Sequence, residues 1–249
     1  MKNYPIVFFD GDKGGVGKSA ACGAFADWAQ AKGLPIAVVD GDARNPDVGR
    51  IFDGVVPISQ ANLRLKDGWM DLTDFIHENS DRMVLISMPA GIGGELAREA
   101  SRFMGMAQSL DRPVGLVWVI NRTLDSINLL NAALSSFGDN LAAKIVLKNL
   151  FFGEADKFRR WDDSNTKKKF ESAGGVTLTL AELHERVMDK LFGDPKNIMP
   201  YSAAAMPMKE YEKTPHKLTP SENVELLTWL QDNDKAFRTV VDKLGVALE

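Results

Sequence analysis

Asp-Gly-Asp-Lys-Gly-Gly-Val-Gly-Lys-Ser, residues 10–19, is a glycine-rich stretch between two runs of different character. Residues 6–9 before it are apolar, and residues 20–31 after it are rich in alanine. This order predicts a buried strand, a glycine loop and a helix. Without Cβ atoms the loop can wrap closely around a phosphate, and its N–H groups and the first helical turn point at that anion. The stretch therefore predicts a phosphate-binding loop.

Particular side chains of this loop have predictable roles. Lys18 supplies positive charge to the β- and γ-phosphates of a nucleotide, and the Ser19 hydroxyl is a ligand for Mg²⁺. The other predicted nucleotide contacts surround these two residues: Asp12, Lys13, Gly14, Gly15, Val16, Gly17 and Ala20. Gly-Lys-Ser between a strand and a helix predicts nucleotide binding more specifically than glycines alone.

The loop departs from the common P-loop pattern at two positions. Asp12 stands where that pattern has its first glycine, and Lys13 is a second lysine directly before Gly-Gly. Lys-Gly-Gly-Val-Gly-Lys-Ser resembles the deviant Walker A loop of the ParA/MinD family of P-loop ATPases. The resemblance implies that Lys13 acts across a dimer interface, on the nucleotide of the partner. The alternative is a lysine that is merely solvated.

Composition narrows the class of protein. With 249 residues, 45% of them hydrophobic, the chain is long enough for one domain spanning residues 1–249. A net charge of −4 gives no overall basic field for nucleic acid. One cysteine excludes an internal disulfide framework and a thiolate metal cluster, and suits a reducing cytoplasm. No apolar stretch reaches transmembrane length, so we expect a cytoplasmic protein without a membrane partner.

The remaining apolar runs predict the fold class. Residues 36–39, 83–86 and 114–120 are apolar without polar alternation, which is typical of parallel strands covered on both faces. Helical patterns separate them, so the chain repeats a βαβ unit with right-handed crossovers. The sequence therefore predicts a three-layer α/β/α fold around a mostly parallel, twisted sheet.

Acidic residues follow the second predicted strand. Asp40 and Asp42 open the segment 40–47, at the sheet edge where Mg²⁺ and an attacking water would lie. The segment resembles switch I of the ParA/MinD family, which implies that Asp42 orients the hydrolytic water and that Asp40 lies near the metal. Together with Ser19, these two carboxylates form the predicted Mg²⁺ site. The alternative is a polar turn.

A third segment resembles the same family but lacks one of its charges. Residues 84–94 are an apolar strand running into Pro-Ala-Gly and further glycines, similar to the Walker B strand and switch II loop. Ser87 stands where the family has an aspartate. A hydroxyl can still hold a metal-bound water, but without the negative charge we expect weak Mg²⁺ binding and slow hydrolysis.

Two further positions are predicted to contact adenine, both by resemblance. Asn149 follows a predicted strand at 142–147, and Asn121 is the runner-up at the end of the preceding strand. Residues 198–201 resemble the late strand and loop that pass over the base in the family, which implies a contact from Pro200. For Asn149 a plain turn asparagine is an equal alternative.

Residues 150–175 interrupt the βα rhythm with an insertion that is both basic and aromatic. Phe158, Trp161 and Phe170 alternate with lysines and arginines, which is a pattern seen in nucleic-acid surfaces. Acidic residues dilute the charge, so we favour aromatic side chains that pack inward under a solvated face. The insertion loosely resembles the plasmid mobilisation and conjugal-transfer branch of the family.

The combined resemblance implies an ATP-dependent switch. Mg·ATP would lie between two protomers of a homodimer, with Lys18 and Ser19 acting in cis and Lys13 in trans. Asp42 would position water for a slow hydrolysis that releases the dimer. The implied setting is plasmid partition, plasmid maintenance or conjugative DNA transfer. It includes a regulatory protein of unknown identity and leaves open direct or indirect association with DNA.

Two other functions fit the same motifs. P-loop folds include kinases and synthetases that transfer a phosphoryl group to a small molecule, and the sequence does not exclude one. Ser87 in place of an aspartate also fits a nucleotide-dependent binding module with little hydrolysis. No Asn-Lys-x-Asp guanine motif is present, which favours adenine over guanine.

Overall fold

A computed structural model describes residues 3–42, 46–194 and 196–248 of the chain. Its centre is a seven-stranded sheet in the order β3-β2-β4-β1-β5-β6-β7, and every described pairing is parallel. The strands are β1 (Ile6–Asp10), β2 (Ile36–Asp40), β3 (Ile58–Gln60), β4 (Met83–Ser87), β5 (Val114–Ile120), β6 (Ala143–Asn149) and β7 (Val176–Leu180). The predicted α/β class is confirmed.

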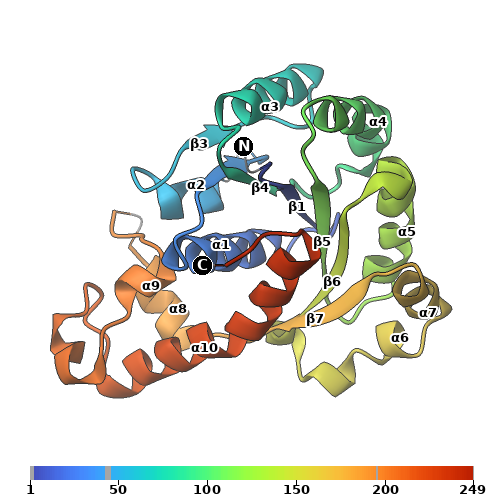
Figure 1. Cartoon of the computed structure of the whole chain (residues 1–249). Coiled ribbons are helices and arrows are strands. Elements are labelled where there is room, and N and C mark those ends of the chain that lie inside the picture. The colour runs from blue at the N-terminus through green and yellow to red at the C-terminus, as the bar shows by residue number, and fades with distance from the viewer. Residues whose placement is uncertain (1–2, 43–45, 195, 249) are drawn as a thin grey trace.

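Helices cover both faces of this sheet (Figure 1). One face carries α1 (Lys18–Ala31), α2 (Asp47–Phe52), α8 (Glu185–Phe192), α9 (Tyr201–Ala204) and α10 (Pro220–Lys243). The other carries α3 (Lys66–Glu78), α4 (Gly93–Ser109), α5 (Asp125–Phe137), α6 (Arg159–Asp162) and α7 (Asn165–Ser172). Short 3₁₀ helices are η1 (Gly138–Asn140), η2 (Leu150–Phe152), η3 (Ala155–Lys157) and η4 (Met208–Lys213).

Neighbouring side chains of β1 show how the two layers are built. Successive residues of a strand point to opposite faces. Phe8 packs against Phe103 of α4 with a ring-centroid distance of 5.0 Å, whereas Phe9 packs against Phe25 of α1 at 5.5 Å. Both rings of β1 are almost completely buried, which explains why the central strands are continuous apolar runs.

The helix after the glycine loop is the most buried helix of its layer. Alanines let α1 lie close to the sheet, and Phe25 and Trp28 fill the space between α1 and α10. Cys22 is fully buried on α1, and burial raises the pKa of its thiol well above the usual value. Among the described residues, no helix combines the length and the apolar character needed to cross a bilayer.

One prediction about the second half of the chain needs correction. The strand expected at residues 198–201 is wrong: Pro200 precedes α9, and its carbonyl accepts the N–H groups of Ala203 and Ala204. Proline fixes φ and donates no hydrogen bond, so it suits the start of a helix better than a central strand. Residues 220–243 form one helix of 24 residues, α10, which starts with a Thr219–Glu222 capping box.

The three aromatic residues that alternate with basic residues in the 150–175 insertion pack inward, as we favoured, whereas Phe151 at its start is exposed. Phe158, Trp161 and Phe170 are each at most 4% exposed, so none offers a surface for stacking a base. Lys148 of β6 reaches Asp162 at 2.7 Å and lies over the Phe158 ring. This buried cation holds the insertion against the end of the sheet.

Candidate nucleotide-binding site

The glycine loop lies at the carboxyl end of β1, the central strand, and leads directly into α1. Gly15 and Gly17 have φ angles of +76° and +96°, a region that side chains other than glycine adopt rarely. A Cβ atom at Gly17 would also lie 2.2 Å from Nδ2 of Asn149. Central strand, glycine loop and helix form the arrangement of a P-loop NTPase.

Lys18 is held inside this loop. Its side chain is only 7% exposed, and Nζ donates to the main-chain oxygen of Lys13 at 2.7 Å. Burial lowers the pKa of Lys18, while the carboxylates of Asp10, Asp12 and Asp42 act in the opposite direction. The loop is thus closed around the Lys18 ammonium group, and the phosphate contact of Lys18 stays a prediction.

Asp10 fixes the first residues of the loop, and sequence reasoning missed this role. Its buried Oδ1 accepts hydrogen bonds from the N–H groups of Gly11 (2.7 Å) and Asp12 (2.9 Å). Burial raises its pKa to about 6, and the two N–H groups oppose that rise. A carboxylate as the last residue of a buried strand, directly before a glycine loop, was the available signal.

The predicted acidic segment lies on the neighbouring part of the same edge. Asp40 and Ser87 are paired residues at the ends of β2 and β4, and both are buried. The Asp40 carboxylate accepts the N–H groups of Asp42 (3.2 Å), Val48 (3.0 Å) and Gly49 (3.2 Å). Burial raises the pKa of Asp40 to about 6. In this structure the Asp40 carboxylate therefore links the end of β2 to Asp42 and to the first turn of α2.

The predicted Mg²⁺ ligands are oxygen atoms, which suit this hard cation. Among the described residues, no three His, Cys, Asp or Glu side chains are grouped closely enough to hold a metal ion alone. Residues 43–45 of the acidic segment lie outside the described residues. The donors available fit an ion held by Ser19 and a carboxylate together with phosphate and water, and the roles of Asp40 and Asp42 stay predictions.

Asn149 connects the end of β6 to the loop. Its Nδ2 donates to the main-chain oxygen of Val16 at 3.0 Å, and its Oδ1 accepts the N–H of Phe151 at 3.2 Å. The side chain is 6% exposed. Asn149 thus holds the glycine loop against the end of β6. Its contact with adenine stays a prediction.

A cavity of about 300 Å³ begins where the loop ends. Ser19 and Ala20 form one end of it, and the other lining residues are Asp47, Arg50, Ile51, Met188, Phe192, Ile198 and Tyr201. Small-molecule sites have this size and this mixture of apolar walls with a few polar groups. Pro200 is buried directly before Tyr201 and does not line this cavity. Its contact with adenine stays a prediction.

One wall of this cavity is fixed by a buried carboxylate of α1. Asp27 is fully buried and accepts hydrogen bonds from the main-chain N–H (3.0 Å) and the hydroxyl (2.6 Å) of Ser202. Ser202 follows Tyr201 in α9, so the contact anchors that short helix against α1. Burial raises the pKa of Asp27 to about 6, although both hydrogen bonds oppose the rise.

The raised pKa of Asp27 predicts an unusual pH dependence. A carboxyl group whose pKa is higher in the folded than in the unfolded protein stabilises the fold at low pH, where it is protonated. This stabilisation is lost as the pH rises through the pKa of the folded state. Asp27→Asn keeps an acceptor for the Ser202 N–H and removes the charge. We expect the variant to match wild type at pH 4 and to be about 2 kcal/mol more stable at pH 7.5 in urea unfolding.

Asp242→Asn, at an exposed position of α10, is the matched control and should change neither value by more than about 0.5 kcal/mol. Equal destabilisation of Asp27→Asn at both pH values would contradict the prediction, because it would show a purely geometric role.

Lys13 points away from the inside of the loop. Its ammonium group forms an ion pair with the Asp125 carboxylate at the start of α5, and its side chain is 39% exposed. The two lysines therefore have different surroundings: Lys18 is enclosed by the loop, whereas Lys13 lies at the surface beside it. Sequence reasoning missed this contact between Lys13 and Asp125.

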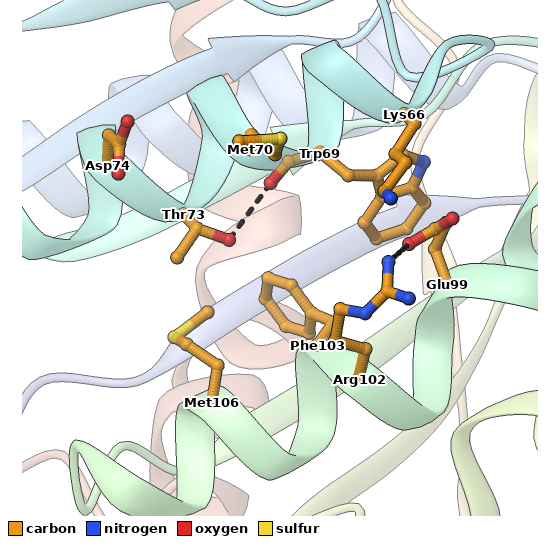
Figure 2. Close-up of a pocket in the computed structure, with 9 residues that line it drawn as sticks. All are labelled: Lys66, Trp69, Met70, Thr73, Asp74, Glu99, Arg102, Phe103 and Met106. Carbon is orange, nitrogen blue, oxygen red and sulfur yellow. Dashed lines mark hydrogen bonds and ion pairs between the residues drawn. The ribbon is translucent and has the colours of Figure 1, made fainter.

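A second cavity of about 300 Å³ lies between α3 and α4, on the opposite face of the sheet. Figure 2 shows Trp69 and Phe103 between the two helices and Arg102 paired with Glu99. The distance between the Arg102 and Glu99 side chains is 2.8 Å. None of the predicted nucleotide-binding residues lines it. We therefore assign the candidate site to the cavity beside Ser19.

The chain is similar to known proteins in both sequence and structure. No family model matches it. "Protein MobD" of Acidithiobacillus ferrooxidans is 27% identical over 236 residues, covering 95% of this chain and 97% of the relative. Among solved structures, a nucleotide-binding protein of Archaeoglobus fulgidus in complex with ADP has 15% identity and a TM-score of 0.46, covering 74% of this chain and 84% of its own.

The 54 kDa signal recognition particle protein of Aeropyrum pernix, in complex with GDP, has 14% identity and a TM-score of 0.48. The match covers 97% of this chain and 50% of that protein. TM-scores below 0.5 do not establish a shared fold. The assignment to the P-loop NTPase fold therefore rests on the sheet order and the loop geometry of this chain.

Proposed function

We propose that this protein binds ATP with Mg²⁺ and uses it to switch between a monomer and a homodimer. The observation that carries the proposal is the continuity of the loop around Lys18 with the cavity that starts at Ser19 and Ala20. A triphosphate in the loop would place its nucleoside part toward that cavity. Slow hydrolysis, with Asp42 positioning water, would reverse the switch.

The exposed position of Lys13 supports the dimeric part of the proposal. A lysine that served its own nucleotide would be expected inside the loop, where Lys18 already lies. A surface ion pair such as Lys13–Asp125 is weak and can open at little cost. We propose that Lys13 then contacts the nucleotide of the partner protomer.

The mass of the protein in solution tests this proposal. We expect light scattering to give the 27.4 kDa monomer with ADP and twice that mass with Mg·ATP. Lys13→Ala should stay monomeric in both, because each protomer loses its contact to the opposite nucleotide. Lys168→Ala removes an exposed lysine of α7 and should behave as wild type. A molar mass that is the same with ADP and with Mg·ATP would exclude the switch.

The proposal includes a biological setting. We propose mobilisation or partition of DNA, on the basis of the sequence resemblance, and the name of the MobD relative is compatible with it. A binding module with little hydrolysis is the second candidate, favoured by the buried hydroxyl of Ser87 at the end of β4. Phosphate release that stays near background in the ATP-bound dimer would favour this candidate.

A further inference from the structure

Asp12 has an unusual position in the phosphate loop. Its φ angle is +51°, a left-handed conformation that aspartate tolerates better than most residues. Its N–H donates to Asp10, so its main chain is fixed at the base of the loop. The common pattern has glycine here, which adopts the same conformation without a side chain. The carboxylate of Asp12 is therefore an added group that the backbone geometry does not require.

That carboxylate binds a second segment of the site. Oδ1 accepts the N–H groups of Ile92 (2.8 Å) and Gly93 (3.2 Å), and the main-chain oxygen of Asp12 accepts the N–H of Gly91. These three residues connect β4 to α4, and Gly93 is the first residue of α4. Asp12 thus neutralises N–H groups at the positive end of a 17-residue helix.

The same carboxylate lies within the field of Lys18. The negative charge of Asp12 favours the protonated form of Lys18, and the negative charge of Asp10 acts in the same direction. Lys18 is the group that we assign to the terminal phosphates, so a terminal phosphate and the Asp12 carboxylate compete for one positive region. Two anions in one such region repel each other, and the N–H groups of Ile92 and Gly93 can satisfy only one of them at a time.

We propose that the Asp12 carboxylate competes with a γ-phosphate for the N–H groups of Ile92 and Gly93, and so senses whether a nucleoside triphosphate or a diphosphate is bound. The γ-phosphate displaces the Asp12 carboxylate from the N–H groups of Ile92 and Gly93, and these groups then bind the phosphate. A diphosphate leaves the Asp12 contacts intact. The start of α4 consequently reports which nucleotide is bound. This inference rests on the proposed nucleotide-binding function.

Two substitutions separate the charge of Asp12 from its hydrogen bonds. Asp12→Asn keeps Oδ1 as an acceptor for Ile92 and Gly93 but has no negative charge. Asp12→Gly removes the side chain and fits the positive φ angle without strain. Asp74→Asn changes an exposed carboxylate of α3 and serves as the matched control.

The test measures dissociation constants for ADP and for the non-hydrolysable triphosphate AMP-PNP at equal Mg²⁺. We expect Asp12→Asn and Asp12→Gly to strengthen AMP-PNP binding by about 10-fold relative to ADP, since like-charge repulsion is lost. Asp74→Asn should keep the wild-type ratio. In ¹H–¹⁵N spectra of wild type, the Gly93 amide should shift with AMP-PNP and not with ADP.

An unchanged ratio of the two affinities in both Asp12 variants would overturn the inference and leave Asp12 with a structural role. A Gly93 amide that shifts equally with both nucleotides would overturn it as well. If wild type binds neither nucleotide, the proposed function fails, and this inference fails with it. The two failures are distinguishable, because ADP binding is absent only when the proposed nucleotide-binding function itself is wrong.

Discussion

Lys18→Met is expected to weaken the binding of both ATP and ADP by at least about 30-fold. Nζ of Lys18 is enclosed by the loop, where it bonds to the Lys13 oxygen and faces several carboxylates. Truncating a buried charge that pairs with a ligand charge costs about 2–5 kcal/mol, which corresponds to about 30-fold to several thousand-fold in affinity. Methionine keeps most of the apolar stem, so the loop should remain folded.

Calorimetric titration with Mg·ADP and Mg·ATP measures this effect. Lys168→Met is the control, because it makes the same lysine-to-methionine change at an exposed position of α7. Its affinities should stay within about twofold of wild type, as expected for an exposed charge far from the loop. Retained tight binding in Lys18→Met would mean that the anion site lies elsewhere.

Arg112→Met is expected to destabilise the fold by about 3 kcal/mol. Arg112 is 6% exposed two residues before β5, and its guanidinium group donates to five main-chain carbonyl groups. They belong to Tyr4, Pro5, Ile76, Asn79 and Arg82. Methionine fills the volume but leaves these carbonyls without a donor, at about 1–3 kcal/mol for each one that stays buried.

Part of that cost is recovered, because burial of the guanidinium group is itself unfavourable and lowers its pKa to about 10. Urea unfolding measures the net change. Arg102→Met, at a side chain that is 67% exposed on α4, should change the free energy of unfolding by less than about 0.5 kcal/mol. Equal effects of the two substitutions would show that water replaces Arg112 at the carbonyls.

The sheet and the phosphate loop could be predicted because their signals are local. Continuous apolar runs mark buried parallel strands, and Gly15 and Gly17 are needed for backbone angles that few other residues adopt. The helix after the loop follows from its alanines and from Gly33 after its end. Each of these features depends on neighbours within a few residues along the chain.

The contacts that organise the site connect distant parts of the chain. Asn149 supports Val16, Asp12 binds the start of α4, and Asp125 pairs with Lys13. No periodicity or short motif encodes which strand ends become neighbours in space. The strand expected at residues 198–201 failed for a related reason, since the contact of Asp27 with Ser202 favours a short helix there.

The buried thiol of Cys22 has a practical consequence. Maleimides react with thiolates, and this thiol is both shielded from solvent and difficult to ionise, so the folded protein should resist labelling at neutral pH. Because it is the sole cysteine, one new cysteine at an exposed position such as Lys168 would carry a dye or spin label alone. The separation between two labelled copies can then be measured directly, without first removing a native residue from the core.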